Sequence, residues 1–143
     1  MTTVDDLLET FDLLGDEWEE RFQYVIDLGK NLPDLPAADK VERNKVQGCQ
    51  SQVWMTAHAT ADQPPRLEIA ADADAFIVKG LVAILLLVYS GKTADEILSL
   101  DIEGLFQKLG LDRNLTPTRS NGLHAMVRRI QAYARQMKEA GTV

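Results

Sequence analysis

The chain has 143 residues, 45% of them hydrophobic and 26% charged, which is the length and composition of one soluble globular domain. Its formal net charge of -7 argues against a nucleic-acid partner, because phosphate backbones are bound mainly through lysine and arginine. The only cysteine, Cys49, excludes an internal disulfide and a cysteine-rich metal or iron–sulfur site within one chain, and it fits a reducing compartment.

The first thirty residues predict a cytoplasmic protein that begins with two short antiparallel helices. Residues 1–9 hold three acidic and no basic side chains, unlike a secretory or organellar targeting segment. Thr3 can cap the first helix, whose apolar residues recur at helical spacing up to a glycine stop. Asp16 begins the second helix, with Glu19 three residues on as in a capping box, and Gly29 gives a stop.

A β-hairpin is predicted in the middle of the chain, after an extended segment and a loop over residues 31–46. Residues 51–59 alternate between two faces, and residues 66–71 alternate again after a turn-like stretch. Cys49 therefore lies just outside the first strand. Residues 72–75 can supply a third short strand or cap the helix that follows.

The helix after the hairpin is the most apolar part of the chain. Residues 76–89 are apolar almost all round, which predicts a central helix covered on several sides and packed on the sheet. At about 14 residues this run is short of the roughly 20 needed to cross a bilayer, so no membrane partner is expected. Gly91 ends it, and a capping box of Thr93 with Glu96 begins a short helix.

The last third of the chain predicts further helices. Residues 101–109 can form one or two turns, residues 111–118 form a linker, and Thr118 or Ser120 caps a long final helix. Four basic side chains of that helix are predicted to face water: Arg128, Arg129, Arg135 and Lys138. Together the elements predict one α+β domain over residues 1–143, with roughly five or six helices around a small antiparallel sheet of about three strands.

Cys49 is the candidate reactive group. A free cysteine is more often a small buried hydrophobe, but Cys49 follows Gly48 in a loop of neutral amides that can turn sharply and solvate a thiolate. At its ordinary pKa of about 8.5 only about 3% of a thiol is ionised at pH 7. Lys45, Arg43 or a more distant arginine could lower the pKa of Cys49.

The two histidines are weak candidates for a catalytic base. His58 lies nine residues from Cys49 along a predicted strand, which is too far unless the chain folds back sharply. His124 could approach Cys49 only through tertiary structure. A structural role is favoured for both.

Three charged residues of loops and junctions are less easily explained by a solvated helix face. Asp72 and Asp74 fall where the sheet meets the central helix, and capping that helix explains one of them. Arg119 lies between a proline and a glycine, where a loop arginine can pair with an anion or a thiolate. A plain surface role is equally compatible with its spacing.

Three segments together resemble one protein family. Residues 46–54 (VQGCQSQVW), 72–81 (DADAFIVKGL) and 115–123 (LTPTRSNGL) are similar, in matching order, to the SufE family of cysteine desulfuration proteins. The resemblance runs over nearly the whole chain. It implies an α+β fold like that of the iron–sulfur scaffold proteins, with no metal and no cofactor held by this chain.

The family resemblance also implies a role in sulfur transfer. The chain would accept sulfur from a pyridoxal-phosphate-dependent cysteine desulfurase of the SufS or CsdA type, stimulate it, and pass the sulfur on for iron–sulfur cluster assembly. The pyridoxal phosphate belongs to that partner, and the next acceptor would be a scaffold such as a SufBCD-type complex. The acceptor cysteine of the family falls on Cys49, which would carry the sulfur as a persulfide.

The resemblance assigns supporting roles to other residues of the sulfur site. Gly48 and Gln52 would support the site or bind the partner, Asp74 would hold the loop that carries Cys49 or tune docking, and Arg119 would lie near the sulfur or the docking surface. At rest the cysteine side chain would be tucked into an apolar cavity. Candidates for its walls are Val46, Val53 and the helix segment 77–81.

Two other functions remain open at this point. A thiol redox sensor would use Cys49 as a target that peroxide oxidises to sulfenic acid, without any partner. An adaptor would stimulate a partner by docking alone, with Cys49 incidental.

Overall fold

The alternating segments of the sequence form the sheet, in a computed structural model that describes residues 3–143. Met1 and Thr2, which belong to the expected domain and N-terminal segment, lie outside the described residues. Strand β1 (Val53–Ala59) pairs antiparallel with β2 (Arg66–Ala73), as the hairpin prediction requires. The short strand β3 (Lys92–Thr93) pairs with the start of β2, which gives the sheet order β1-β2-β3.

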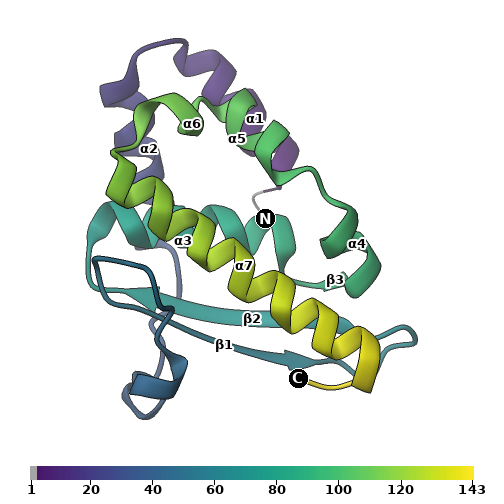
Figure 1. Cartoon of the computed structure of the whole chain (residues 1–143). Helices are drawn as coiled ribbons and strands as arrows, with labels where there is room; N and C mark the ends of the chain where they lie inside the picture. The colour runs from purple at the N-terminus through teal and green to yellow at the C-terminus, as the bar shows by residue number, and fades with distance from the viewer. Residues whose placement is uncertain (1–2) are drawn as a thin grey trace.

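The helices confirm the predicted α+β class (Figure 1). They are α1 (Val4–Leu14), α2 (Trp18–Lys30), α3 (Phe76–Tyr89), α4 (Ala94–Ser99), α5 (Ile102–Leu109), α6 (Leu111–Asn114) and α7 (Pro117–Ala140). Two single turns of 3-10 helix, η1 (Ala37–Asp39) and η2 (Glu42–Asn44), interrupt the long connection between α2 and β1. The predicted cap at Thr3 and the predicted capping box at Thr93 are both present, and Thr3 forms a full capping box with Asp6.

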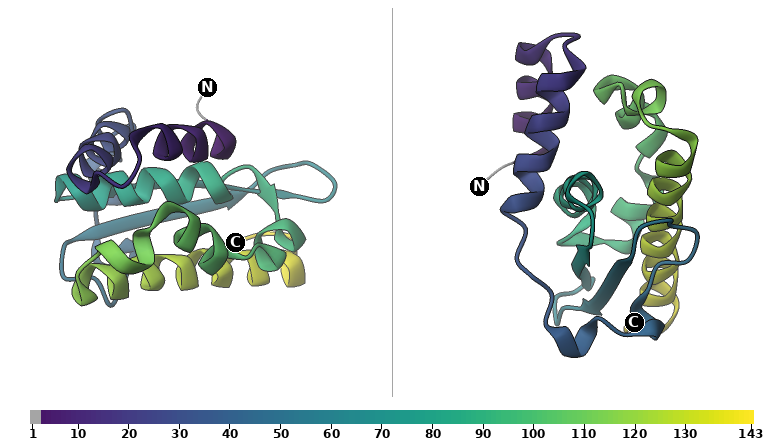
Figure 2. Two further views of the ribbon diagram at one scale, coloured as in Figure 1. Left: turned by 90° about the horizontal axis from the view of Figure 1, so that it is seen from above. Right: turned by 90° about the vertical axis from the view of Figure 1, so that its left-hand side faces the viewer.

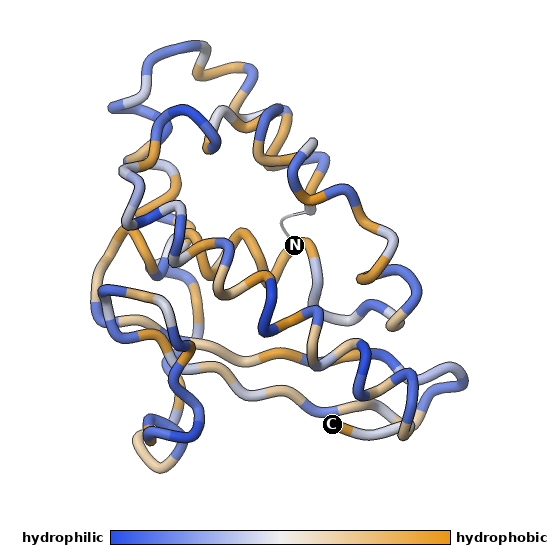
Figure 3. The backbone as a smooth tube through the Cα atoms, viewed as in Figure 1, coloured by the Kyte–Doolittle hydropathy of each residue, from blue (hydrophilic) through white to orange (hydrophobic). Residues whose placement is uncertain are grey.

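Helix α3 is the centre of the fold, as its all-round apolar character predicted. Figure 2 shows it end-on between α2 and α7, above the sheet, and it contacts all three. Nine of its fourteen residues are buried. Along α7, hydrophilic and hydrophobic residues alternate instead, because only one face of that helix meets the core (Figure 3).

Helix α2 differs from its prediction at both ends. It begins at Trp18 after Glu17, without a side-chain cap, so the capping box of Asp16 and Glu19 is wrong. It also runs through Gly29 to Lys30. A Cβ atom added at Gly29 would lie 2.6 Å from the backbone nitrogen of Gly80 in α3. This glycine therefore serves a close helix contact, not a helix stop.

Residues 72–75 form neither a third strand nor a side-chain cap, which corrects both predictions. Strand β2 continues to Ala73, and α3 begins after Ala75 without a side-chain hydrogen bond. Both aspartates of this segment accept hydrogen bonds from other parts of the backbone. Neither carboxylate accepts a backbone hydrogen bond from the first turn of α3.

The predicted linker at residues 111–118 contains α6 and the first turn of α7. Thr116, not Thr118 or Ser120, caps α7 with its hydroxyl oxygen, which accepts a hydrogen bond from the Arg119 N–H at 3.3 Å. Pro117 occupies the first helical position, where its missing N–H costs nothing. Arg119 consequently belongs to a helix and not to a loop.

Over residues 3–143, no helix combines the length and the apolar character that a bilayer span needs.

Candidate functional site

Cys49 lies at the tip of a narrow loop, here called the Cys49 loop and defined as residues 46–53. The Val46 N–H donates to the Val53 carbonyl at 2.8 Å, which closes the neck of the loop. Just before the tip, Gly48 has a φ of 93°, in the left-handed region that side chains disfavour. The sharp turn predicted at Gly48 is present, and it directs Cys49 toward α7.

The tip of the loop packs directly on α7. The Cys49 thiol donates to the Gly122 carbonyl, with Sγ and O 3.5 Å apart. A Cβ atom added at Gly122 would lie 3.4 Å from Sγ, and one added at Gly48 would lie 3.2 Å from the Ala125 Cβ. Small residues on both sides therefore permit this close approach, and neither Gly122 nor Ala125 was identified from the sequence.

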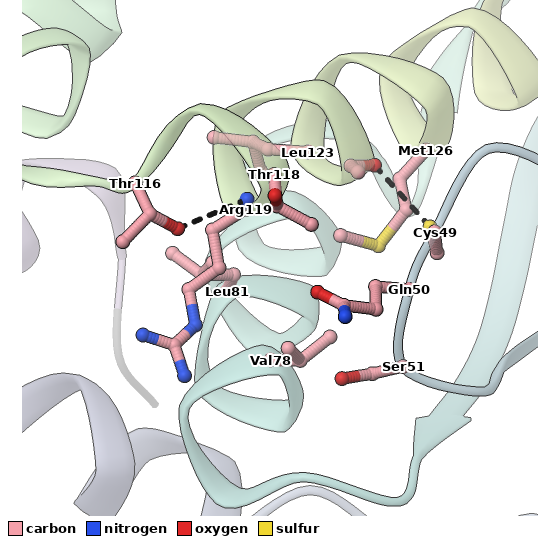
Figure 4. Close-up of a pocket in the computed structure, with 11 residues that line it drawn as sticks. Cys49, Gln50, Ser51, Val78, Leu81, Thr116, Thr118, Arg119, Leu123 and Met126 are labelled. Atoms are coloured by element: carbon pink, nitrogen blue, oxygen red, sulfur yellow. Dashed lines mark hydrogen bonds between the residues drawn. The ribbon is translucent and has the colours of Figure 1, made fainter.

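A cavity of about 200 Å³ adjoins the thiol (Figure 4). Its lining comes from the Cys49 loop, α3 and the start of α7: Cys49, Gln50, Ser51, Val78, Leu81, Thr116, Thr118, Arg119, Gly122, Leu123 and Met126. The α3 wall was expected, whereas Val46 and Val53 line a separate hollow of about 250 Å³. Of the α7 wall, only Arg119 was expected near the sulfur. The rest was missed because it lies about seventy positions further along the chain, where helical periodicity identifies a buried face but not its neighbour.

Burial raises the pKa of the Cys49 thiol above its ordinary value. The expected lowering by Lys45 or Arg43 is therefore wrong for this conformation. The Lys45 ammonium pairs with Glu42 at 3.3 Å instead. At neutral pH the sheltered thiol is protonated and poorly nucleophilic.

Asp74 and Gln52 extend the hairpin ladder by one pair beyond the end of the strands. The Asp74 carboxylate accepts from the Gln52 N–H at 3.0 Å, and the Asp74 N–H donates to the Gln52 carbonyl at 3.1 Å. Gln52 is three residues from Cys49 in the chain. Asp74 thereby fixes the C-terminal side of the Cys49 loop.

Arg119 lines the same cavity as Cys49, but Figure 4 places the guanidinium and the sulfur at opposite ends of the lining, with Gln50 and Met126 between them. The first turn of α7 brings Arg119 there. The side chain is thus available to an anion that enters the cavity and does not touch the resting thiol.

The histidines have partners away from Cys49. The His58 ring lies 3.1 Å from the Glu68 carboxylate across the hairpin. The His124 ring bridges the Ser120 carbonyl and the Glu103 carboxylate, at 2.8 Å each. Within residues 3–143, no three His, Cys, Asp or Glu side chains gather into a group that could hold a metal ion.

Comparison with known proteins gives a consistent result. The family model for SufE, described as an Fe-S metabolism associated domain, matches residues 5–134. SufE-like proteins of Rhizobium meliloti (strain 1021) and Rhizobium etli are 50% and 48% identical to this chain; the matches cover 94% of the chain in each case, and 96% and 91% of the relatives.

The fold has a solved counterpart. The solution structure of a hypothetical protein from Thermus thermophilus superposes with a TM-score of 0.72 at 24% identity, over 96% of both chains. This likeness supports the fold, and the sequence matches identify the family. The chain belongs to the SufE family, which is associated with iron–sulfur metabolism.

Proposed function

We propose that this protein accepts one sulfur atom on Cys49 from a pyridoxal-phosphate-dependent cysteine desulfurase and passes it on for iron–sulfur cluster assembly. The observation that carries the proposal is the position of Cys49, at the tip of a loop beside a cavity, in a chain of the SufE family. Sulfur exchange of this kind requires a thiolate, access and a partner that positions the donor.

The proposed transfer is a thiol–disulfide type of exchange. The Cys49 thiolate attacks the outer sulfur of a persulfide on the desulfurase, and a new S–S bond forms between Sγ and that sulfur. The S–S bond of the donor breaks, and its electron pair leaves with the donor thiolate, which takes up a proton. Cys49 gives up one proton to solvent, so the exchange needs no external oxidant or reductant.

The sheltered thiol must leave its resting place before it can react. Its hydrogen bond to Gly122 and its raised pKa both disfavour the thiolate in the cavity. We infer that docking of the desulfurase draws the loop tip outward, where solvation returns the pKa toward its ordinary value. Gly48 would supply the turn, and Gln52 with Asp74 the fixed end, for this movement.

Arg119 would serve the transferred sulfur, not the resting thiol. A persulfide is more acidic than a thiol, so the carried sulfur is an anion at neutral pH. The guanidinium at the far end of the cavity is a suitable counter-charge for it. SufS or CsdA is the proposed kind of donor, a SufBCD-type complex the proposed kind of acceptor, and the cytoplasm the proposed location.

The test is intact-mass analysis after incubation with such a desulfurase and free cysteine. The wild-type chain is expected to gain the mass of one sulfur atom, and reductant is expected to remove it. Cys49→Ser should gain nothing. Undiminished stimulation of the desulfurase by Cys49→Ser would instead support the adaptor, and rapid peroxide oxidation without any partner would support the redox sensor.

A further inference from the structure

One face of α7 supports the Cys49 loop at three points. Gly122 accepts from the thiol, Ala125 lies under Gly48, and Arg129 reaches the neck of the loop. Positions 122, 125 and 129 are spaced i, i+3 and i+7, which places them on one side of the helix. Gly122 and Ala125 are small and lie where the loop tip comes closest to α7. The longer Arg129 side chain lies near the neck of the loop.

Arg129 was predicted to face water, and the structure corrects this. One terminal nitrogen donates to the Lys45 carbonyl at 2.9 Å, and the other donates to the Arg43 carbonyl at 3.1 Å. Its Nε donates to the Tyr133 hydroxyl at 2.8 Å, and that hydroxyl donates to the Met55 carbonyl at 3.3 Å. All three guanidinium nitrogens are thus used.

These bonds act on the chain just before the loop. Lys45 forms a β-bridge with Trp54 immediately outside the neck of the loop. The two carbonyls that Arg129 binds therefore belong to the segment that enters the loop, residues 43–45, here called its N-terminal stem. Asp74 holds the opposite stem through Gln52. The tip therefore lies between two fixed ends, and a charged side chain supplements the backbone hydrogen bonds at each of them.

We propose that Arg129 is a positioning residue for Cys49: its guanidinium fixes the N-terminal stem of the Cys49 loop on α7 and so keeps the thiol beside Gly122. It acts through the backbone of residues 43–45, without contact to the sulfur. A planar fork of donors suits this task, because two neighbouring carbonyls are bound at once. A lysine at this position could not donate to both carbonyls and to the Tyr133 hydroxyl in the same geometry.

The test measures the rate at which iodoacetamide alkylates Cys49 with no partner present. Arg129→Gln is expected to react at least about tenfold faster than wild type, because tenfold matches the loss of one charge-assisted hydrogen bond and the neutral amide replaces none of the three with a charged donor. Arg129→Lys should fall between the two, as partial rescue. The matched control is Arg135→Gln, an exposed arginine of the same helix, which should react like wild type.

Thermal melting of each variant shows whether the fold persists. If Arg129→Gln does not fold, Arg129→Lys and Tyr133→Phe carry the test, each with a smaller expected rise in rate. Equal rates for wild type and a folded Arg129→Gln or Arg129→Lys would overturn the proposal, as would an equal rise in Arg135→Gln. The alkylation assay needs no desulfurase, so a wild-type chain that accepts no sulfur would defeat the proposed function and leave this result standing.

Discussion

Asp72 and Asp74 are two residues apart at the same end of β2, yet they do different work. Asp72 is 2% exposed and accepts hydrogen bonds from the Leu35 and Ala73 N–H groups at 3.0 and 2.8 Å. Lys40 and Lys79 lie 3.3 and 3.4 Å from its carboxylate. Asp74 makes a local pair with Gln52.

The difference shows that the role of a carboxylate depends on the hydrogen-bond donors and charges that the fold places around it. Burial of Asp72 opposes ionisation, but the two backbone donors and the two lysines outweigh it and hold the pKa of Asp72 below its ordinary value. Asp72 therefore ties the segment after α2 to the sheet, whereas Asp74 serves only the Cys49 loop. Loss of Asp72 should damage the scaffold, and loss of Asp74 should damage the site.

The largest effect is expected from Asp72→Asn. The amide cannot satisfy both lysines and both backbone donors, so the free energy of unfolding should fall by about 3 kcal/mol. Urea unfolding measures it. A loss no greater than that of Asp74→Ala would contradict the contrast between the two residues.

Acid should weaken the stabilisation that the Asp72 carboxylate provides. Because the folded-state pKa of Asp72 is lowered, its stabilisation is complete above the unfolded value of about 3.9 and disappears as pH falls through the folded value. Unfolding free energies measured from neutral pH to about pH 3 should therefore converge for wild type and Asp72→Asn. Curves that stay parallel would show that Asp72 is not the group responsible.

Asp74→Ala should cost only about 1 kcal/mol of stability, because it removes one exposed hydrogen bond. Its effect on the reactivity of Cys49 should be more pronounced than its effect on stability. Without the carboxylate, Gln52 keeps only its bond from the Asp74 N–H, so the C-terminal side of the Cys49 loop is held less firmly and iodoacetamide should alkylate Cys49 several-fold faster. The contrast would be undermined by an Asp74 variant that melts far below wild type but alkylates at the wild-type rate.

The smallest effect is expected from Asp34→Asn. The Asp34 side chain is 84% exposed although it lies only 2.9 Å from the Lys79 ammonium, and exposed ion pairs stabilise little. The expected loss is below about 0.5 kcal/mol by urea unfolding. A loss comparable to that of Asp72→Asn would make Lys79, not Asp72, the centre of this network.

Local patterns predicted the parts of the fold that depend on neighbouring residues. Period-two alternation identified the hairpin, the cap at Thr3 was predicted from its residue type, and the capping box at Thr93 was predicted from its spacing to Glu96. Gly29 and Arg129 could not be read this way. A glycine stop and a glycine contact look alike in sequence, and the length of Arg129 is explained only by carbonyls some eighty residues earlier.

The candidate site also has features that could be predicted from the sequence and features that depend on tertiary contacts. Cys49 was identified by the residues around it and by family motifs, and the α3 wall of its cavity was expected from the family resemblance. The opposite wall comes from α7, and the raised pKa of the thiol comes from burial that exists only in the folded chain. Tertiary contacts of this kind leave no local pattern.

The close contact between Gly29 of α2 and Gly80 of α3 has a consequence for access to Cys49, on the opposite side of α3. Helix α3 lies between that contact and α7, and its residues Val78 and Leu81 line the cavity beside Cys49. A methyl group at position 29 is therefore expected to push α3 toward α7 and narrow the room behind the thiol. Faster alkylation of Cys49 in a folded Gly29→Ala chain would reveal this, and an unchanged rate would show that α2 moves instead. Faster alkylation would mean that access to the Cys49 sulfur depends on Gly29, a residue that does not line the cavity.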